Sequence, residues 1–82
     1  MSYVHEVCHL AKKLERPLSI EHDTKSFKYK VFILNVVSKE KHLWREVFGL
    51  GFTIEDAAYD FIRKAKGLEL ENWLTDKIVD VP

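Results

Sequence analysis

The residues whose types and spacing could hold a metal ion or act as a nucleophile stand near the N-terminus. His5 and His9 are four residues apart, a spacing that can present two imidazoles of a helix to one ion. Cys8 lies between them on an apolar stripe, where a thiol is most often buried and inert. The chain has no HExxH or CxxC motif and no third ligand at a fixed spacing. The pattern favours solvated histidines, and we expect no bound metal or cofactor.

No other pattern in the sequence points to catalysis. The chain has no GxSxG motif, and Gly49-Leu50-Gly51 is too short to stand for a phosphate-binding GxxxxGK[ST] loop. The paired carboxylates Glu55/Asp56 and Glu69/Glu71 fall at expected helix starts, where the helix dipole accounts for them. We therefore expect a protein that is not an enzyme and that has no small-molecule substrate.

Length and composition indicate one small domain that spans residues 1–82. The 82 residues are 46% hydrophobic and 32% charged, which is close to the globular norm. Thirteen basic residues balance thirteen acidic ones, so the bulk charge does not favour nucleic acid or an anionic membrane. A single cysteine excludes an internal disulfide framework. Because the chain has no long apolar run and no signal peptide, we expect a cytoplasmic protein without a membrane partner.

Apolar spacing predicts a first helix and then three strands. Ser2 to about Arg16 has helical periodicity with Ser2 as N-cap, and Pro17 closes the helix. The expected apolar stripe consists of Tyr3, Val4, Val7, Cys8, Ala11 and Leu14. From residue 18 the period becomes two, which predicts strands over 18–22, 27–37 and 42–48 in an antiparallel meander with a turn over 38–41.

A second helix is expected after Thr53, with Thr53 as N-cap, Asp56 completing the capping box and Gly67 just past the end. Beyond it, apolar residues predict a third, shorter helix: Leu70, Trp73, Leu74, Ile78 and Val81. The predicted fold class is α+β, in the order α-β-β-β-α with a three-stranded antiparallel sheet. Both helices pack on one face, and a short C-terminal helix follows a core of about residues 3–67.

The strand over 27–37 is apolar on both faces at its far end. Phe27, Tyr29, Val31 and Ile33 share one face, and the other face continues with three apolar residues: Phe32, Leu34 and Val36. Either the C-terminus covers this end, or it forms a dimer or partner interface. Two tryptophans, Trp44 and Trp73, are anchors either of the core or of an interface. The candidate protein contacts are Phe32, Leu34, Trp73 and Ile78.

The order helix, three-stranded meander, helix resembles the double-stranded RNA-binding domain family over residues 3 to about 67. The segment Glu6-Val7-Cys8-His9-Leu10-Ala11 is similar to the first helix of that family, and Pro17 follows at the usual distance. The run Gly49-Leu50-Gly51-Phe52-Thr53-Ile54-Glu55-Asp56-Ala57-Ala58 falls where the family opens its last helix. The resemblance implies the same α-β-β-β-α scaffold.

The sequence departs from the family at the residues that bind nucleic acid. Members bind phosphates through lysines at the start of the second helix, whereas the counterparts here are Ile54, Glu55 and Ala58, with Asp56 nearby. A carboxylate repels phosphate and cannot replace a counterion. Asp23-Thr24-Lys25-Ser26 replaces the Gly-Pro-x-His loop of the family, and only Glu6 of the three contact regions is retained. The resemblance implies a module for protein–protein interaction or self-association, with a protein partner or a homodimer.

Gly51-Phe52-Thr53-Ile54-Glu55-Asp56-Ala57 also resembles the helix opening of small HicB-type antitoxins, which carry it after a three-stranded sheet. Those chains begin with a strand, whereas this chain begins with a helical pattern. The motif is little more than a capping box followed by an alanine.

Nucleic-acid binding is the alternative function. Residues 1–48 hold nine Lys or Arg and six Asp or Glu, so this half is basic. A basic patch on the first helix and the sheet would bind double-stranded RNA or DNA in a salt-sensitive manner. Its candidate contacts are Glu6, Lys12, Lys13, Arg16, Lys25, Lys28, Lys30, Lys39, Lys41 and Arg45.

Overall fold

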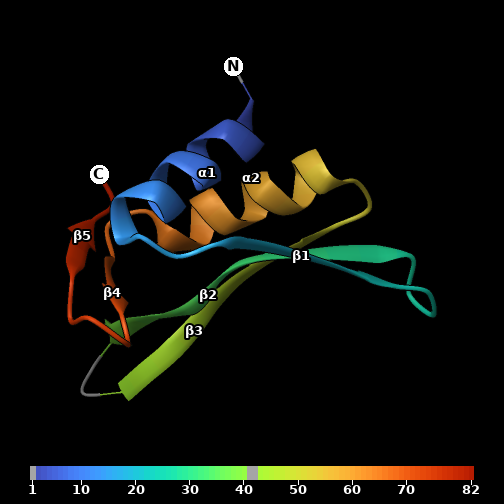
Figure 1. The fold of residues 1–82 in the computed structure, drawn as a ribbon. Coiled ribbons are helices and arrows are strands. Elements are labelled where there is room, and N and C mark those ends of the chain that lie inside the picture. The colour runs from blue at the N-terminus through green and yellow to red at the C-terminus, as the bar shows by residue number, and fades with distance from the viewer. Residues whose placement is uncertain (1, 41–42) are drawn as a thin grey trace.

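The computed structural model describes residues 2–40 and 43–82 (Figure 1). The described residues form two helices and a five-stranded antiparallel sheet. Both helices lie side by side on one face of the sheet, as expected for this α+β fold (Figure 1). In chain order the elements are α1 (Tyr3–Leu14), β1 (Leu18–Asp23), β2 (Lys28–Glu40), β3 (Leu43–Gly51), α2 (Ile54–Ala65), β4 (Glu69–Asn72) and β5 (Ile78–Asp80).

The long strand β2 is the centre of the sheet. Its first half pairs with β1 on one edge, from Lys28 to Ile33, and β3 runs along the other edge. Where β1 ends, β4 takes over the same edge and pairs with Val36 to Ser38, and β5 extends the sheet beyond β4. Between the two partners, the N–H of Leu34 donates to the carbonyl of Pro17, at 3.1 Å. This edge of β2 is therefore occupied along most of its length.

A bulge at Asn35 reverses the side-chain alternation of β2. The register with β3 shifts between Phe32 and Val37, and Asn35 has a left-handed φ of 58°. Before the bulge, Val31 and Ile33 face the helices, and after it the buried Val36 does. A regular alternation along the strand predicts Val36 on the opposite face, together with Phe32 and Leu34. The bulge, for which the sequence offers no glycine, is the reason that this assignment was wrong.

The core lies between the sheet and the helices. Its buried residues are Val7, Leu10, Ala11, Leu14, Val31, Ile33, Val36, Val47, Ala57, Ala58, Phe61, Ala65, Leu70 and Val81. The first helix ends at Leu14, two residues before the predicted end, because Glu15 takes a left-handed φ of 58° and the N–H of Arg16 bonds back to Ala11. The N-cap Thr53 accepts the N–H of Asp56, and Gly67 has a φ of 81°, which confirms both expected ends of α2.

Helix α2 packs directly on the backbone of β3. A Cβ atom added to Gly49 would lie 2.0 Å from the carbonyl oxygen of Ala57, and one added to Gly51 would lie 2.5 Å from the nitrogen of Ala57. The third strand was expected to end at Phe48, but it continues to Gly51. The two glycines belong to the strand because only residues without a side chain allow the helix this close.

The predicted C-terminal helix is wrong: residues 69–72 and 78–80 form the hairpin of β4 and β5. The spacing of apolar residues fitted a helix, but the free edge of β2 beyond β1 is satisfied by a strand. The turn expected over 38–41 is also wrong for residues 38–40, which belong to β2. Residue 41, and residue 42 at the predicted start of the third strand, lie outside the described residues. Within β4, Leu70 and Asn72 point into the core.

The buried Asn72 fastens this hairpin to α1. Its side-chain Nδ2 donates to the carbonyl of Leu14 at 2.7 Å, which satisfies one of the free carbonyls at the end of the helix. Its Oδ1 accepts the N–H of Leu74 at 2.9 Å and so shapes the turn toward β5. A single amide thus joins the C-terminal end of the first helix to the last two strands.

Within the described residues, neither helix has the length and apolar character needed to cross a membrane.

Candidate interaction surface

The face of the sheet opposite the helices is rich in apolar side chains. Cross-strand pairs share a face, so the register places Phe32 beside Phe48 and places Lys30 beside Leu50 on this outer face. Its described apolar members are Phe32, Leu34, Val37, Trp44, Phe48, Leu50, Trp73 and Ile78. We refer to these residues as the outer-face cluster. A sheet face that carries this many apolar residues is a candidate contact surface.

Lys30 covers two aromatic rings of this face. Its ammonium lies 4.9 Å from the ring centroid of Phe32 and 4.8 Å from that of Phe48. The same ammonium lies 3.6 Å from a carboxylate oxygen of Glu46. Phe32 is therefore only 8% exposed although it is not part of the core on the helix side.

A hollow of about 250 Å³ opens beside the bulge on the same face. Phe32, Leu34, Val37 and Trp73 contribute to its wall, and Leu34 and Trp73 are 40% and 58% exposed. The ring of Trp44 meets that of Trp73 edge-on at 6.1 Å. The structure thus brings three of the four predicted protein contacts together around one hollow.

The fourth predicted contact, Ile78, lies on the outer face two strands away. The register aligns Glu46, Val37, Glu71 and Ile78 across four neighbouring strands.

The predicted protein contacts do not include Phe48 and Leu50, which also lie on this face. The alternation of these residues with Gly49 and Gly51 would have indicated their face, since the glycines must lie under a helix.

The two ends of the outer face differ in charge. Glu69, Glu71 and Asp80 lie on β4 and β5, at one end of the face. Toward the β1–β2 turn the face carries Lys28 and Lys30 together with Glu21, which pairs in register with Lys30. Asp23 is engaged within this turn, where it accepts bonds from the Lys25 N–H and the Ser26 hydroxyl. The β4–β5 end of the face is therefore more acidic than the end near the β1–β2 turn, where Lys28 and Lys30 lie with Glu21.

The predicted nucleic-acid contacts are spread over several parts of the molecule. Lys12, Lys13 and Arg16 belong to α1 or follow it, whereas Lys28 and Lys30 lie on the opposite side of the sheet. Glu6 and Lys13 border a hollow of about 450 Å³ between the two helices and the C-terminal residues. Lys25 is in the β1–β2 turn, and Arg45 is near the far end of β3. Lys39 and Lys41 lie outside the part of the chain whose side chains the structure describes.

The acidic start of α2 holds the first helix. The Oε2 of Glu55 accepts the Ser2 hydroxyl at 3.0 Å, and its Oε1 accepts the N–H of Tyr3. The bond from Tyr3 N–H lowers the pKa of Glu55 below its ordinary value, and the Ser2 hydroxyl acts in the same direction. Ser2 is the N-cap residue as predicted, but its hydroxyl bonds Glu55 and does not cap α1. The carboxylate of Glu55 thus has structural partners in the first turn of α1.

Side chains of α2 cap the open edge of β3. Asp60 Oδ2 accepts the N–H of Leu50 at 2.9 Å, and Lys64 donates to the carbonyl of Phe48 at 3.3 Å. Asp60 also pairs with Lys64 at 2.9 Å and with Arg63 at 2.6 Å. Burial alone would raise the pKa of Asp60, but the Leu50 N–H and the two cations lower it to about 2.

The depressed pKa of Asp60 predicts a loss of stability in acid. A carboxyl group whose pKa is lower in the folded state contributes stability above its unfolded pKa, and this contribution is lost as the pH falls toward 2. Replacing Asp60 with asparagine should lower the free energy of unfolding at pH 7 by about 1 kcal/mol, after allowance for solvent screening. Urea titrations at pH 7 and pH 2 measure this effect. The difference from the wild type should vanish near pH 2, and a difference of equal size at both pH values would contradict the assignment. Asp80→Asn serves as the exposed control.

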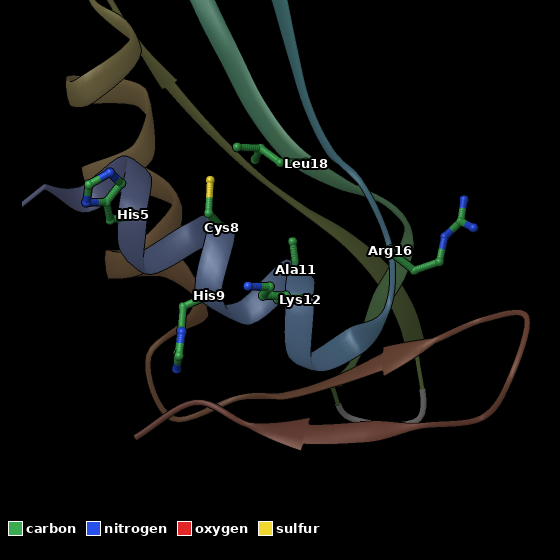
Figure 2. A pocket seen from close by; sticks show the side chains of 7 residues that line it. All are labelled: His5, Cys8, His9, Ala11, Lys12, Arg16 and Leu18. Atoms are coloured by element: carbon green, nitrogen blue, oxygen red, sulfur yellow. The ribbon is translucent and has the colours of Figure 1, made fainter.

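A second feature is the groove between α1 and β1, with a volume of about 560 Å³ (Figure 2). Cys8 and Leu18 line it, and Cys8 is exposed, so its expected place on the buried stripe is wrong. The buried stripe of α1 consists of Val7, Leu10, Ala11 and Leu14. The helix is rotated from the expected orientation, and Cys8 turns toward β1.

The side chains of Cys8 and His9 leave α1 in different directions (Figure 2). Among the described residues, no three His, Cys, Asp or Glu side chains are grouped so as to hold a metal ion.

Comparisons of the chain with models of protein families, with curated proteins and with solved structures find no match.

Proposed function

We propose that this protein is a non-enzymatic interaction module that self-associates through the outer face of its sheet. The single observation that carries the proposal is the outer-face cluster, which the helices leave uncovered. The scaffold is proposed to be a degenerate double-stranded-RNA-binding-domain-like fold, supported by the order α-β-β-β-α over residues 3–65 with both helices on one face. In this proposal Leu34, Trp73 and Ile78 contact the second copy of the protein. Phe32 lies beneath the side chain of Lys30 and supports this surface.

The size of the molecule suits such an interface. Its extents are 34 × 27 × 21 Å. A face bounded by the two longer dimensions can bury about 800 Å² per partner, the area typical of a stable interface. Exposed aromatic residues at the centre, such as Trp73, are the kind of side chain that dominates binding energy.

The charges of the face favour a second copy as the partner. In a two-fold symmetric dimer the same surface meets itself with its ends exchanged. The acidic end with Glu69, Glu71 and Asp80 would then oppose Lys28 and Lys30 of the other copy. Opposite charges at the rim set the orientation of the two copies, whereas the apolar centre supplies the affinity.

Leu34→Glu tests the proposal. Leu34 lies beside the hollow near the centre of the face, so each copy of the variant would place a carboxylate close to the two-fold axis. Like charges brought together in an apolar interface cost several kcal/mol, and the dimer should dissociate at least about 100-fold more readily. Sedimentation equilibrium of the wild type and the variant measures the association constant at about 50 mM and about 500 mM salt.

The matched control is Tyr59→Glu, which introduces the same charge at an exposed aromatic residue of α2 on the other side of the molecule. This variant should associate as the wild type does. A wild type that remains monomeric at high concentration would overturn the proposal. Labelled duplex RNA and duplex DNA are titrated in parallel, and salt-sensitive binding without self-association would establish nucleic-acid binding in its place.

A further inference from the structure

The strand β1 presents an open edge on the side away from β2. The N–H of Leu34 donates to Pro17, which lies directly opposite it in the register of β1 and β2. Pairs in an antiparallel ladder alternate, so Ser19 and Glu21 also bond to β2. The N–H and C=O groups of Leu18, Ile20 and His22 therefore point outward. Within the described part of the chain, no other group hydrogen-bonds to them.

The other edges of the sheet are less available to a new strand. On β3, the outward N–H of Leu50 donates to Asp60, and the outward carbonyl of Phe48 accepts a hydrogen bond from Lys64. Strand β5 has only three residues. Side-chain caps and very short strands are devices by which proteins prevent pairing at an edge. Strand β1, with six residues, has an edge without such a cap in the described chain.

The groove beside this edge has a basic lining. Leu18, Ala11 and Cys8 provide a partly apolar floor, and Lys12 contributes positive charge, whereas the Nε of Arg16 donates to the carbonyl of Leu34 at 3.0 Å. None of the described residues that line the groove carries a carboxylate. A strand added to β1 would direct alternate side chains toward α1 and into this groove. Negative charge on those side chains would match the lining.

We propose that β1 binds an extended acidic segment of a partner protein, which joins the sheet as a sixth strand. The backbone of the segment pairs with Leu18, Ile20 and His22, and its carboxylates lie near Lys12. An acidic peptide fits this edge better than nucleic acid does, because a phosphate backbone has no N–H donors to offer the outward carbonyls. This surface is separate from the outer face and does not depend on self-association.

The test uses the full chain and a blocked heptapeptide of alternating glutamate and valine, with the alternating lysine and valine peptide as control. Binding is followed by backbone NMR shifts and by hydrogen exchange. The glutamate peptide should bind at least about tenfold more tightly than the lysine peptide. It should slow exchange at the amides of Leu18, Ile20 and His22, while the amides of Ser19 and Glu21 change little. A glutamate peptide that does not bind, or that slows none of these three amides, would overturn the proposal.

Two variants test the edge and the groove separately. Ile20→Pro removes an outward N–H without removing a bond to β2, and proline is tolerated on an edge strand. This variant should stay folded and lose at least about tenfold in peptide affinity. The matched control Glu21→Pro removes a bond to β2 and should destabilise the β1–β2 pair.

Lys12→Glu should also reduce the affinity about tenfold, whereas Lys66→Glu, at the end of α2, should leave it unchanged. Equal losses in both variants would contradict a role for the groove. Labelled duplex RNA that shifts the same residues and displaces the peptide would assign the groove to nucleic acid and overturn the proposal.

Discussion

Replacing Gly49 with alanine is expected to lower the free energy of unfolding by at least ~3 kcal/mol, at the upper end of what overpacking costs. The new methyl carbon would lie 2.0 Å from the carbonyl oxygen of Ala57 and 2.4 Å from the nitrogen of Phe61. Both atoms belong to the backbone of α2, so no side-chain rotation can relieve the contact. Relief requires that the helix move away from β3, which would open the core around Phe61 and Ala57. Urea unfolding followed by circular dichroism measures the loss.

Gly67→Ala is the matched control. Gly67 also favours glycine, because its φ is 81°, but a Cβ there would meet no atom within 4 Å. The free energy of unfolding should fall by only ~1 kcal/mol, which is the cost of holding a residue with a side chain in the left-handed region. If the variant at Gly49 were as stable as the one at Gly67, the close packing of α2 on β3 would be wrong.

Replacing Asn72 with alanine should produce the second large loss in the free energy of unfolding, about 2–4 kcal/mol. The loss arises because two backbone groups in or near the core would be left without a hydrogen-bond partner. The carbonyl of Leu14 would lose its donor, and the N–H of Leu74 would lose its acceptor. Because Asn72 is 1% exposed, water cannot readily replace either bond. The midpoint of thermal unfolding should fall by at least about 8 °C, since a domain of this size loses 4–8 °C per kcal/mol.

Asn72→Asp separates the lost hydrogen bond from the lost volume. The aspartate keeps the shape and can still accept the N–H of Leu74, but its carboxylate would face the carbonyl of Leu14 at the negative end of α1. Burial and this carbonyl raise the pKa of the new carboxyl in the folded state. A raised pKa gives a variant whose stability falls with rising pH and recovers in acid, where the protonated group donates again. A variant with the same deficit at pH 7 and pH 4 would show that the Leu14 contact does not matter.

The sequence was sufficient for the elements whose determinants are local. Thr53 with Asp56, and Gly67 after the last turn, predicted the ends of α2, because a cap depends on a few neighbouring residues. The alternation after Pro17 predicted the meander of β1, β2 and β3. The apolar spacing of α1 predicted a helix but not its rotation, since Tyr3 and Cys8 fit the stripe in sequence and yet are exposed.

The remaining features depend on contacts between distant segments. Asparagine tolerates a left-handed φ, so Asn35 permits a bulge, but the change of partner from β1 to β4 along this edge of β2 is visible only in the strand register. The apolar residues of 68–81 suit a helix or a hairpin, and the edge of β2 decides between them. Of the candidate surface, apolar excess in the sequence alone indicates Phe32, Leu34, Trp73 and Ile78. Their common face, and the open edge of β1, required the register of the strands.

The amide of Asn72 also bears on the order in which the chain folds. It joins groups 58 residues apart in sequence. Strand β4 pairs with β2, although β3 and α2 lie between these two strands in the chain. Closing so long a loop is entropically costly until the surrounding contacts form, so the C-terminal hairpin should dock late. Once docked, it locks the last turn of α1. The amides at the end of α1 and those of β4 should therefore exchange with the same opening free energy, as one cooperative unit, although they stand near opposite ends of the polypeptide.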